Sequence, residues 1–367
     1  MSIVDPTPSN PSGSVVAETA PTPAPSPEVQ VNRGLPFWAN PRFGLAILIV
    51  VALAVFSTLD SKFLNVEFVL FPALRTVAIL SVVGMAQMIA LSIGHMNLAV
   101  GRMAGFGAMF MGISFDLLHL PLYAGLLIGL VAGAGVGALA GWIIATTGVN
   151  SFVVTLAMDF ALLGLIPLVY ATFTDGAAFV VKPDGMQELR SASLADVCVG
   201  PVCGTSAVPI LTIFAGVAIA GVSYMYAKSR LGRRLLVTGA NLTAAKLSGV
   251  PTNRVVITAH MLSGLLAALA GFMAAVTTGS FRASTGDDFM LDSFLGPILG
   301  GTALSGGLVS PLGVVLGTTL MVVIRTGLKL LGIGLENLNI LIGLILLLAL
   351  SVDRGRRILS ERRVTKQ

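Results

Sequence analysis

Charged residues are scarce in this chain. Asp, Glu, Lys and Arg make up only 11% of its 367 residues, whereas 55% of the residues are apolar. Soluble domains carry roughly 25% charged residues, so this composition excludes an ordinary soluble domain. The Lys and Arg residues behind the net charge of +5 are scattered through loops and the C-terminus. That distribution argues against nucleic-acid binding and is typical of a membrane protein that follows the positive-inside rule.

The sequence also lacks the motifs of common catalytic sites. It has no HExxH, no GxSxG and no GxxxxGK[ST] segment, and its three His residues are dispersed (His95, His119 and His260). Without a phosphate-binding loop, the chain is not expected to hydrolyse ATP. We expect no catalytic residue, no metal and no cofactor on this chain, and any ATP-Mg must be bound by another polypeptide.

Cysteine is nearly absent. Cys198 and Cys203 lie in the segment CVGPVC, within a polar stretch between apolar runs. In an oxidising compartment they could close a small disulfide loop, and the alternative is two free thiols. A CxxxxC pair without a nearby cluster of His or acidic residues is weak evidence for a metal site.

Long apolar runs, in contrast, fill most of the chain. A bilayer span needs about 20 apolar residues, and this pattern predicts an all-α, polytopic integral membrane protein with about ten transmembrane helices. The third and eighth runs are the weakest, because glycines and polar residues interrupt them, as in segments that line a pathway or re-enter the membrane. The predicted spans are 43–59, 76–94, 98–115, 121–146, 152–173, 207–227, 255–277, 288–304, 308–330 and 335–352.

Composition and loop charge predict the domain organisation. Residues 1–40, rich in Ser, Thr and Pro, are expected to form a disordered tail without the pattern of a signal peptide. Residues 41–353 form the transmembrane domain, and 354–367 a basic tail. Most Lys and Arg, Arg102 included, then lie on the side of both termini, which predicts cytoplasmic N- and C-termini. The polar loop 228–254 is expected on the same side.

A short helix is predicted inside that loop. Residues 241–247 (NLTAAKL) contain good helix formers. Asn241 is a suitable N-cap, Gly249 suits the position after the helix, and Pro251 prevents continuation. Such a doubly capped helix in a cytoplasmic loop predicts a docking element for a soluble partner. Its neighbours Arg230, Arg233 and Arg234 are explained at least as well by membrane topology alone.

Three polar residues are candidates for the pathway of a solute. Asp159 lies inside a predicted span, where a carboxylate is costly and often functional; the alternative is a satisfied polar contact between helices. Asn97 lies in GHMNLAVGR, with Gln87 one to two turns earlier. These two residues either face a common cavity or belong to a tight structural turn. His95 is expected to be a turn residue, and the segment 300–313 (GGTALSGGLVSPLG) to allow close packing at a broken helix.

Several segments together resemble a known family. In order, they are GHMNLAVG (94–101), NSFVVTLAM (150–158), LGRRLLVTGANLTAAKLSGV (231–250), LSGLLAALAGFM (262–273), LGGTALSGGLVSPLGVVLG (299–317) and LIGLILLLALSVD (341–353). The chain resembles the inner-membrane permease subunits of bacterial ABC importers for monosaccharides, the ribose, xylose and arabinose type. This group belongs to a wider superfamily that also includes branched-chain amino-acid permeases.

The resemblance implies a type II ABC importer-like permease bundle in the bacterial inner membrane. It implies four kinds of partner: cytoplasmic ABC ATPase subunits, a periplasmic solute-binding protein, a second permease copy (a homodimer is expected) and a small-molecule solute. The short helix corresponds to the family's ATPase-coupling helix. That role is transferred by resemblance to Gly239, Asn241, Ala244, Ala245, Leu247, Ser248 and Gly249.

Departures from the family pattern keep alternatives open. Sugar permeases usually have Asp-Leu-Ser where this chain has Asn97-Leu98-Ala99, and the position of Asp159 is normally apolar. A monosaccharide is the favoured solute, with branched-chain amino acids or nucleosides as alternatives. An ion-coupled secondary transporter is an alternative of another class, disfavoured because such carriers usually show several intramembrane acids.

Overall fold

The structure, a computed structural model, describes residues 41–174, 178–179, 183–196, 198–199, 202–203, 208–334, 340 and 343–344. The predicted tails 1–40 and 354–367 lie outside the described residues, as does most of the predicted span 335–352. The elements run in the order α1 (Pro41–Leu59), η2 (Ser61–Leu64), η3 (Val66–Leu70), α2 (Phe71–Ser92), α3 (Val100–Asp116), α4 (Leu122–Thr147), α5 (Ser151–Phe173), β1 (Ala178–Phe179), α6 (Met186–Ser191), η4 (Leu194–Asp196), β2 (Cys198–Val199), β3 (Val202–Cys203), α7 (Leu211–Lys228), α8 (Arg230–Ala240), α9 (Leu242–Leu247), α10 (Thr252–Thr278), β4 (Phe281–Arg282), α11 (Phe289–Leu299) and α12 (Pro311–Leu330).

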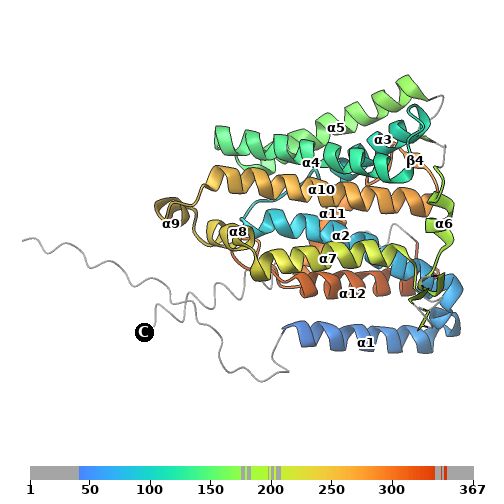
Figure 1. Cartoon of the computed structure of the whole chain (residues 1–367). Coiled ribbons are helices and arrows are strands. Elements are labelled where there is room, and N and C mark those ends of the chain that lie inside the picture. Colours follow the sequence, from blue (N-terminus) through green and yellow to red (C-terminus); the bar gives the residue numbers. More distant parts are fainter. Residues whose placement is uncertain are drawn as a thin grey trace, which may run out of the picture.

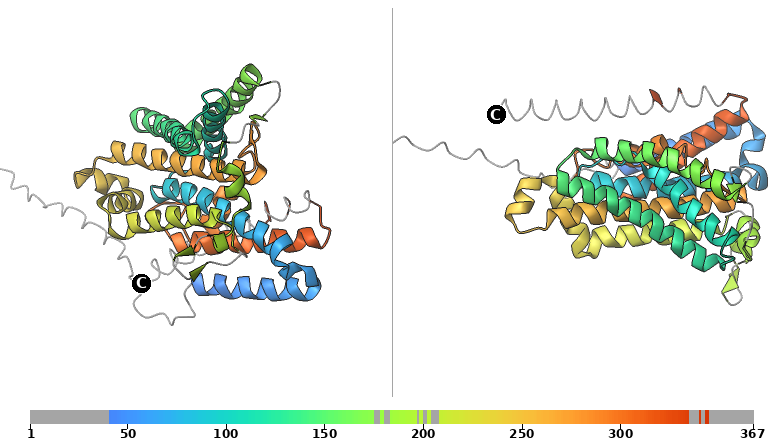
Figure 2. Two further views of the ribbon diagram at one scale, coloured as in Figure 1. Left: turned by 45° about the vertical axis from the view of Figure 1, so that its right-hand side comes forward. Right: turned by 90° about the horizontal axis from the view of Figure 1, so that it is seen from above.

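The described residues form an elongated bundle of helices (Figure 1). One end of the bundle carries α9, and the other carries α6 and β4; we call them the α9 end and the β4 end. Helices α2 and α10 lie in the middle, with α4 and α5 on one flank and α12 and α1 on the other, as the turned view confirms (Figure 2). The prediction of an all-α, polytopic membrane protein is confirmed.

Six described helices are long and apolar enough to cross a membrane. One of them joins η3 to α2 (Val66–Ser92), and the others are α4, α5, α7, α10 and α12. The two runs expected to be weakest are shorter. Helix α3 has 17 residues and α11 only 11, so α11 is about 16 Å long and reaches about half-way through a bilayer core. Residues 288–304 therefore do not form a complete span, because the helix ends at the glycine pair Gly300–Gly301.

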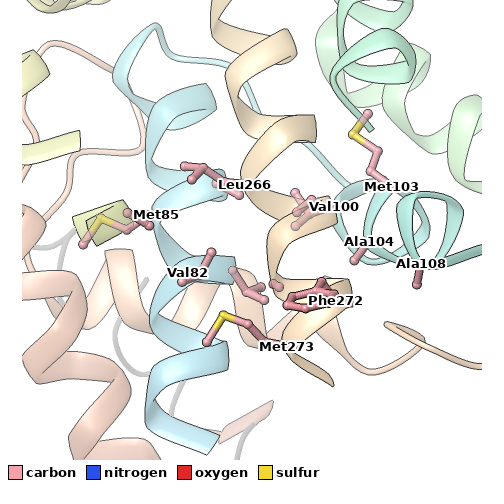
Figure 3. Close-up of a cluster of buried hydrophobic side chains, with 14 of the residues drawn as sticks. Val82, Met85, Val100, Met103, Ala104, Ala108, Leu266, Phe272 and Met273 are labelled. Carbon is pink, nitrogen blue, oxygen red and sulfur yellow. The ribbon is translucent and has the colours of Figure 1, made fainter. Parts of the chain in front are cut away.

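The core lies between α2, α3 and α10. Figure 3 shows side chains of these three helices meeting, among them Val82, Met103 and Phe272. All three are buried completely. Small residues bring α10 against α4: a β-carbon at Gly137 would overlap the carbonyl oxygen of His260. Without a hydrophobic driving force between helices in lipid, such backbone contact is a main source of packing energy.

A two-stranded pairing closes the β4 end. Strand β1 pairs antiparallel with β4, with Phe179 opposite Phe281. Both rings are buried, and they pack on Tyr170 of α5 and Phe115 of α3 respectively. This contact connects the chain after α5 to the chain after α10. It therefore fixes the position from which the segment before α11 begins.

Candidate functional site

Helix α9 has the caps that its sequence predicts. Asn241 Oδ1 accepts a hydrogen bond from the backbone N–H of Ala244 at 3.0 Å. Gly249 follows the helix with a φ of +77°, a conformation that favours glycine. The helix projects from the end of the bundle (Figure 1). Leu247 is 85% exposed and faces outward. Leu242 is 48% exposed and lines a cavity between α9 and the ends of α4, α5 and α10.

The seven residues assigned to the coupling helix divide into two groups. Asn241, Ala244, Leu247, Ser248 and Gly249 are exposed. Ala245 is fully buried, and Gly239 belongs to α8 and faces the interior of the protein. Ala245 and Gly239 therefore seat the helix on the bundle, and the exposed residues, Leu247 above all, offer the contact surface.

Three glycine-rich segments meet beneath α9. A β-carbon at Gly239 would overlap the carbonyl oxygen of Ser92, the last residue of α2, and would lie 2.7 Å from Gly307 N. Gly307 N donates to the same Ser92 oxygen at 2.9 Å. Gly306 has a φ of +87° and comes close to both Gly94 and Gly239. We call these four residues, Gly94, Gly239, Gly306 and Gly307, the glycine junction.

Gln87 and Asn97 contact each other in the interior of the bundle. With its amide oriented to satisfy both groups, Gln87 donates to Asn97 O at 2.8 Å and accepts from Asn97 N at 3.3 Å. Asn97 Nδ2 donates to Ser263 Oγ of α10 at 3.0 Å, and its Oδ1 accepts from Ala99 N at 3.1 Å. Both side chains are fully buried. This geometry favours the structural alternative, in which they stabilise the break between α2 and α3.

Hydroxyl groups in the N-terminal turns of α5 also stabilise the break between α2 and α3. Thr155 Oγ1 accepts from Leu98 N at 3.1 Å, and Ser151 Oγ accepts from Met96 N at 3.3 Å. His95 Nδ1 lies 3.3 Å from His260 Nε2 of α10, so two of the three His residues that are dispersed in the sequence meet in the fold. Sequence reasoning missed Ser151 and Thr155, because hydroxyl residues are common in membrane helices and nothing in their spacing marks a partner.

Asp159 belongs to a cluster of charges on α5, α3 and the segment before α11. Arg102 Nε lies 3.8 Å from Asp159 Oδ1, and Arg102 Nη1 lies 2.5 Å from Asp287 Oδ1. Asp159 is eight residues past Ser151, the first residue of α5, so it lies about 12 Å along that helix. Arg102 and Asp287 lie near the first residues of α3 and α11. Arg102, which loop charge counted on the side of both termini, is thus an ion-pair partner of Asp159 and Asp287.

The charged cluster is open to its surroundings. The side chains of Arg102 and Asp159 are 18% and 15% exposed, and that of Asp287 is 43% exposed. Glycines bring the backbones together here, because a β-carbon at Gly101 would overlap the carbonyl oxygen of Gly286. Sequence reasoning missed Asp287 as a partner of Arg102. The segment before α11 runs along α3, since a β-carbon at Gly105 would also overlap the carbonyl oxygen of Thr285.

A second ion pair fixes α11 to α12. Arg325 donates to both carboxylate oxygens of Asp292, at 2.8 and 2.5 Å. Asp292 lies in the first turn of α11, so the pair anchors the short helix near its beginning. Bidentate guanidinium–carboxylate pairs are directional as well as strong, which suits a helix too short to span the membrane.

The remaining predicted features are less informative. Strand β2 pairs with β3 so that the backbone of Cys198 lies opposite that of Cys203. The side chains of both lie outside the described residues, and their disulfide stays a prediction. Among the described residues, no group of three or more His, Cys, Asp or Glu could hold a metal ion.

Comparison with known proteins gives one family and several relatives. The family model described as "Branched-chain amino acid transport system / permease component" matches residues 69–350. The ribose import permease protein RbsC of Escherichia coli strain K12 is 28% identical over 316 residues, 85% of this chain and 93% of the relative. No solved structure matches the chain.

Two further relatives cover more of the chain. The L-arabinose ABC transporter permease protein AraH of Azospirillum brasilense is 28% identical over 352 residues, 94% of this chain and 97% of its own length. The autoinducer 2 import system permease protein LsrC of Shigella flexneri is 31% identical over 337 residues, 91% of this chain and 93% of its own length.

Proposed function

Because the chain belongs to the family of branched-chain amino acid transport system permease components, we propose that it is the permease subunit of an ATP-driven importer for a monosaccharide. The relatives named for ribose and L-arabinose favour a sugar. The observation that carries the proposal is α9, a capped helix whose leucines Leu242 and Leu247 are exposed at one end of a membrane bundle. Exposed apolar side chains on such a surface are a docking feature.

The partners follow from the two ends of the bundle. An ABC ATPase that binds ATP-Mg docks on α9, so the α9 end and both chain termini face the cytoplasm of a bacterial inner membrane. A solute-binding protein docks at the opposite end, on the polar residues after α5 and around β4. A second permease copy completes the pathway, and this chain itself is no enzyme.

The glycine junction provides a mechanical link from α9 to the membrane interior. When the ATPase closes on ATP, α9 moves and α8 moves with it. Gly239 of α8 contacts the end of α2 and the loop between α11 and α12 at Ser92 and Gly307. Because these contacts are backbone to backbone, they do not yield as flexible side chains would. The movement therefore shifts the population between inward- and outward-facing states.

The charged cluster supplies polar contacts for the solute. Asp159, Arg102 and Asp287 are partly exposed in a membrane-spanning bundle, and charged groups in the membrane face a water-filled path or a protein partner rather than lipid. Carboxylate oxygens accept hydrogen bonds and a guanidinium donates them, which matches the hydroxyl groups of a sugar. We propose that this cluster lies on the solute pathway, at the surface that contacts the second permease copy.

The test is uptake of labelled solutes by a deletion strain and its complemented partner. The panel contains pentoses, hexoses, branched-chain amino acids and nucleosides, with and without ATP depletion. ATP-dependent uptake of one sugar, present only in the complemented strain, is the expected result. Uptake of an amino acid or nucleoside instead would contradict the sugar assignment. Uptake abolished by a protonophore at constant ATP would contradict the ATP-driven class and favour an ion-coupled carrier.

A further inference from the structure

A cavity of about 310 Å³ opens at the α9 end, apart from the charged cluster. Its walls come from the C-terminal end of α4, the N-terminal ends of α5 and α10, the segment after α2, and helices α8 and α9. Cavities of this volume are large enough for small ligands. Gly94 of the glycine junction and Leu242 of the docking helix lie on its wall, but the transport mechanism proposed above assigns no ligand to the cavity.

One wall carries a buried hydroxyl without a partner. Thr238 of α8 lines the cavity and is only 3% exposed, and its Oγ1 has no hydrogen-bond partner among the described residues. Helical threonines elsewhere in the chain bond to the carbonyl four residues back, as Thr155 and Thr258 do at 2.8 and 2.7 Å. Buried polar groups are nearly always paired, so the hydroxyl of Thr238 is an unused donor at the cavity wall. Its oxygen is covered in this structure, and contact with a ligand requires the side chain to rotate towards the cavity.

Two helix N-termini also reach the cavity. Ser151 begins α5, and Thr252 and Asn253 begin α10; all three line the wall. The N-cap position of α10 is Pro251, which makes no side-chain hydrogen bond to the helix.

Asn150 Oδ1 already caps α5 by accepting from Phe152 N at 2.9 Å, and Thr252 N donates to Val250 O at 2.8 Å. The N–H of Asn253, in the first turn of α10, has no intrahelical partner. Together with the helix dipole it favours an anion, and above all a phosphate group.

The surrounding charge has one sign. Lys246 of α9 lines the cavity, and none of the lining residues is acidic. The whole segment 228–254 contains no Asp or Glu. Its cations are Lys228, Arg230, Arg233, Arg234, Lys246 and Arg254. An anion entering this cavity therefore meets donors and positive charge without a competing carboxylate.

We propose that this cavity binds the phosphate group of a small molecule. Lys246 provides the charge, Thr238 donates its free hydroxyl, and the backbone N–H of Asn253 at the start of α10 also donates. Since Lys246 and Leu242 belong to α9, a bound phosphate connects α9 to α10 and restrains it. That inhibitory consequence rests on the proposed coupling role of α9, whereas phosphate binding does not.

The test measures binding to the full-length permease in nanodiscs of phosphatidylcholine. Inorganic phosphate and glycerol 3-phosphate are titrated, with glycerol as the uncharged control, and the unfolding temperature is followed. Both phosphates are expected to raise the unfolding temperature and glycerol is not. Thr238→Val and Lys246→Met should each weaken phosphate binding about tenfold, the loss of one hydrogen bond to a charged group. Lys228→Met, the same change of charge outside the cavity, should leave the affinity unchanged.

Two further arms make the result decisive. Thr238→Ser keeps the hydroxyl and should keep the affinity, while Thr238→Val removes an unpaired buried hydroxyl and should not reduce stability. Nanodiscs containing phosphatidylglycerol test a lipid headgroup as the source. Stabilisation there that Thr238→Val abolishes would assign the phosphate to lipid. No stabilisation in either arm, or equal affinities for wild type, Thr238→Val and Lys246→Met, would overturn the proposal.

Discussion

Gly239 in α8 lies directly against the carbonyl oxygen of Ser92, the last residue of α2, and no side chain fits between them. The same oxygen accepts the backbone N–H of Gly307 at 2.9 Å. Three segments that are far apart in the sequence therefore share one backbone atom. Helix α8, which is proposed to transmit movement from the ATPase, therefore meets the end of α2 and the loop between α11 and α12 at this one carbonyl oxygen.

Gly239→Ala tests the glycine junction. Alanine is the better helix former by roughly 1 kcal/mol, so a mobile or loosely packed α8 would gain stability. We expect a loss instead, by about 1–3 kcal/mol, because the added methyl overlaps backbone that cannot turn away. Thermal unfolding of the purified protein and solute uptake are the measurements. Gly221→Ala in α7, where a β-carbon meets no atom within 4 Å, is the matched control; equal behaviour of the two variants would contradict the role of the junction.

Leu247→Arg tests the docking role of α9. Because this side chain is 85% exposed, the substitution should leave the fold and membrane insertion intact. It places a charge in the proposed ATPase contact, and co-purification of the ATPase should fall at least tenfold. Ala245 is unsuitable for this test, since its side chain is buried and a large residue there would disturb α9 itself.

The matched control is Leu118→Arg, an exposed leucine between α3 and α4. It makes the same chemical change in a turn outside the segment 228–254 and should leave co-purification unchanged. Normal recovery of the ATPase with Leu247→Arg would remove α9 from the interface.

Asp159→Asn tests the solute pathway. The change leaves the shorter pair between Arg102 and Asp287 in place, so the protein should fold normally. The KM of uptake should rise about tenfold, equivalent to ~1.4 kcal/mol, because one charged acceptor for a solute hydroxyl is lost. Asp184→Asn, at an exposed turn before α6, is the control with the same change of charge. An unchanged KM with a lowered unfolding temperature would assign Asp159 to structure alone.

The pair between Asp292 and Arg325 is predicted to be structural. Arg325→Met leaves a buried carboxylate without its partner, and should lower the free energy of unfolding by about 3 kcal/mol. Adding Asp292→Leu should recover most of that loss, since an apolar pair has no charge to compensate. Denaturant unfolding of the single and double variants measures both effects. Lys329→Met, four residues later on α12, is the control; a double variant no more stable than Arg325→Met would contradict the pairing.

Local features of the sequence predicted the local structure well. Asn241 and Gly249 mark the two ends of the short helix α9. They could be recognised in the sequence because a helix cap depends on hydrogen bonds between residues only a few positions apart. The apolar runs likewise predicted α4, α5, α7, α10 and α12, since length and hydropathy alone decide whether a helix can span lipid. The glycine pair Gly300–Gly301 correctly marked a weak span, but not how early the helix would end.

Long-range partners were beyond sequence reasoning. Asp159 was recognised as unusual, but its neighbours Arg102 and Asp287 come from α3 and from the segment before α11, and the sequence does not state how deep either lies. Loop charge counted Arg102 only as a marker of membrane topology, because a charge beside a glycine break shows no pairing partner in the sequence. Asn97 and Gln87 were expected near each other, and only the structure shows that Ser263 of α10 completes their hydrogen bonds.

The sequence by itself thus determined the class of protein and its helices, because apolar length, loop charge and helix caps act through neighbouring residues. Tertiary structure alone decided which side chains face the solvent, which charges pair, and where the glycine segments meet. Those outcomes depend on how α2, α8, α10 and α11 pack against one another. Packing depends on close backbone approach between residues hundreds of positions apart, and no local pattern records which glycine will face which carbonyl oxygen.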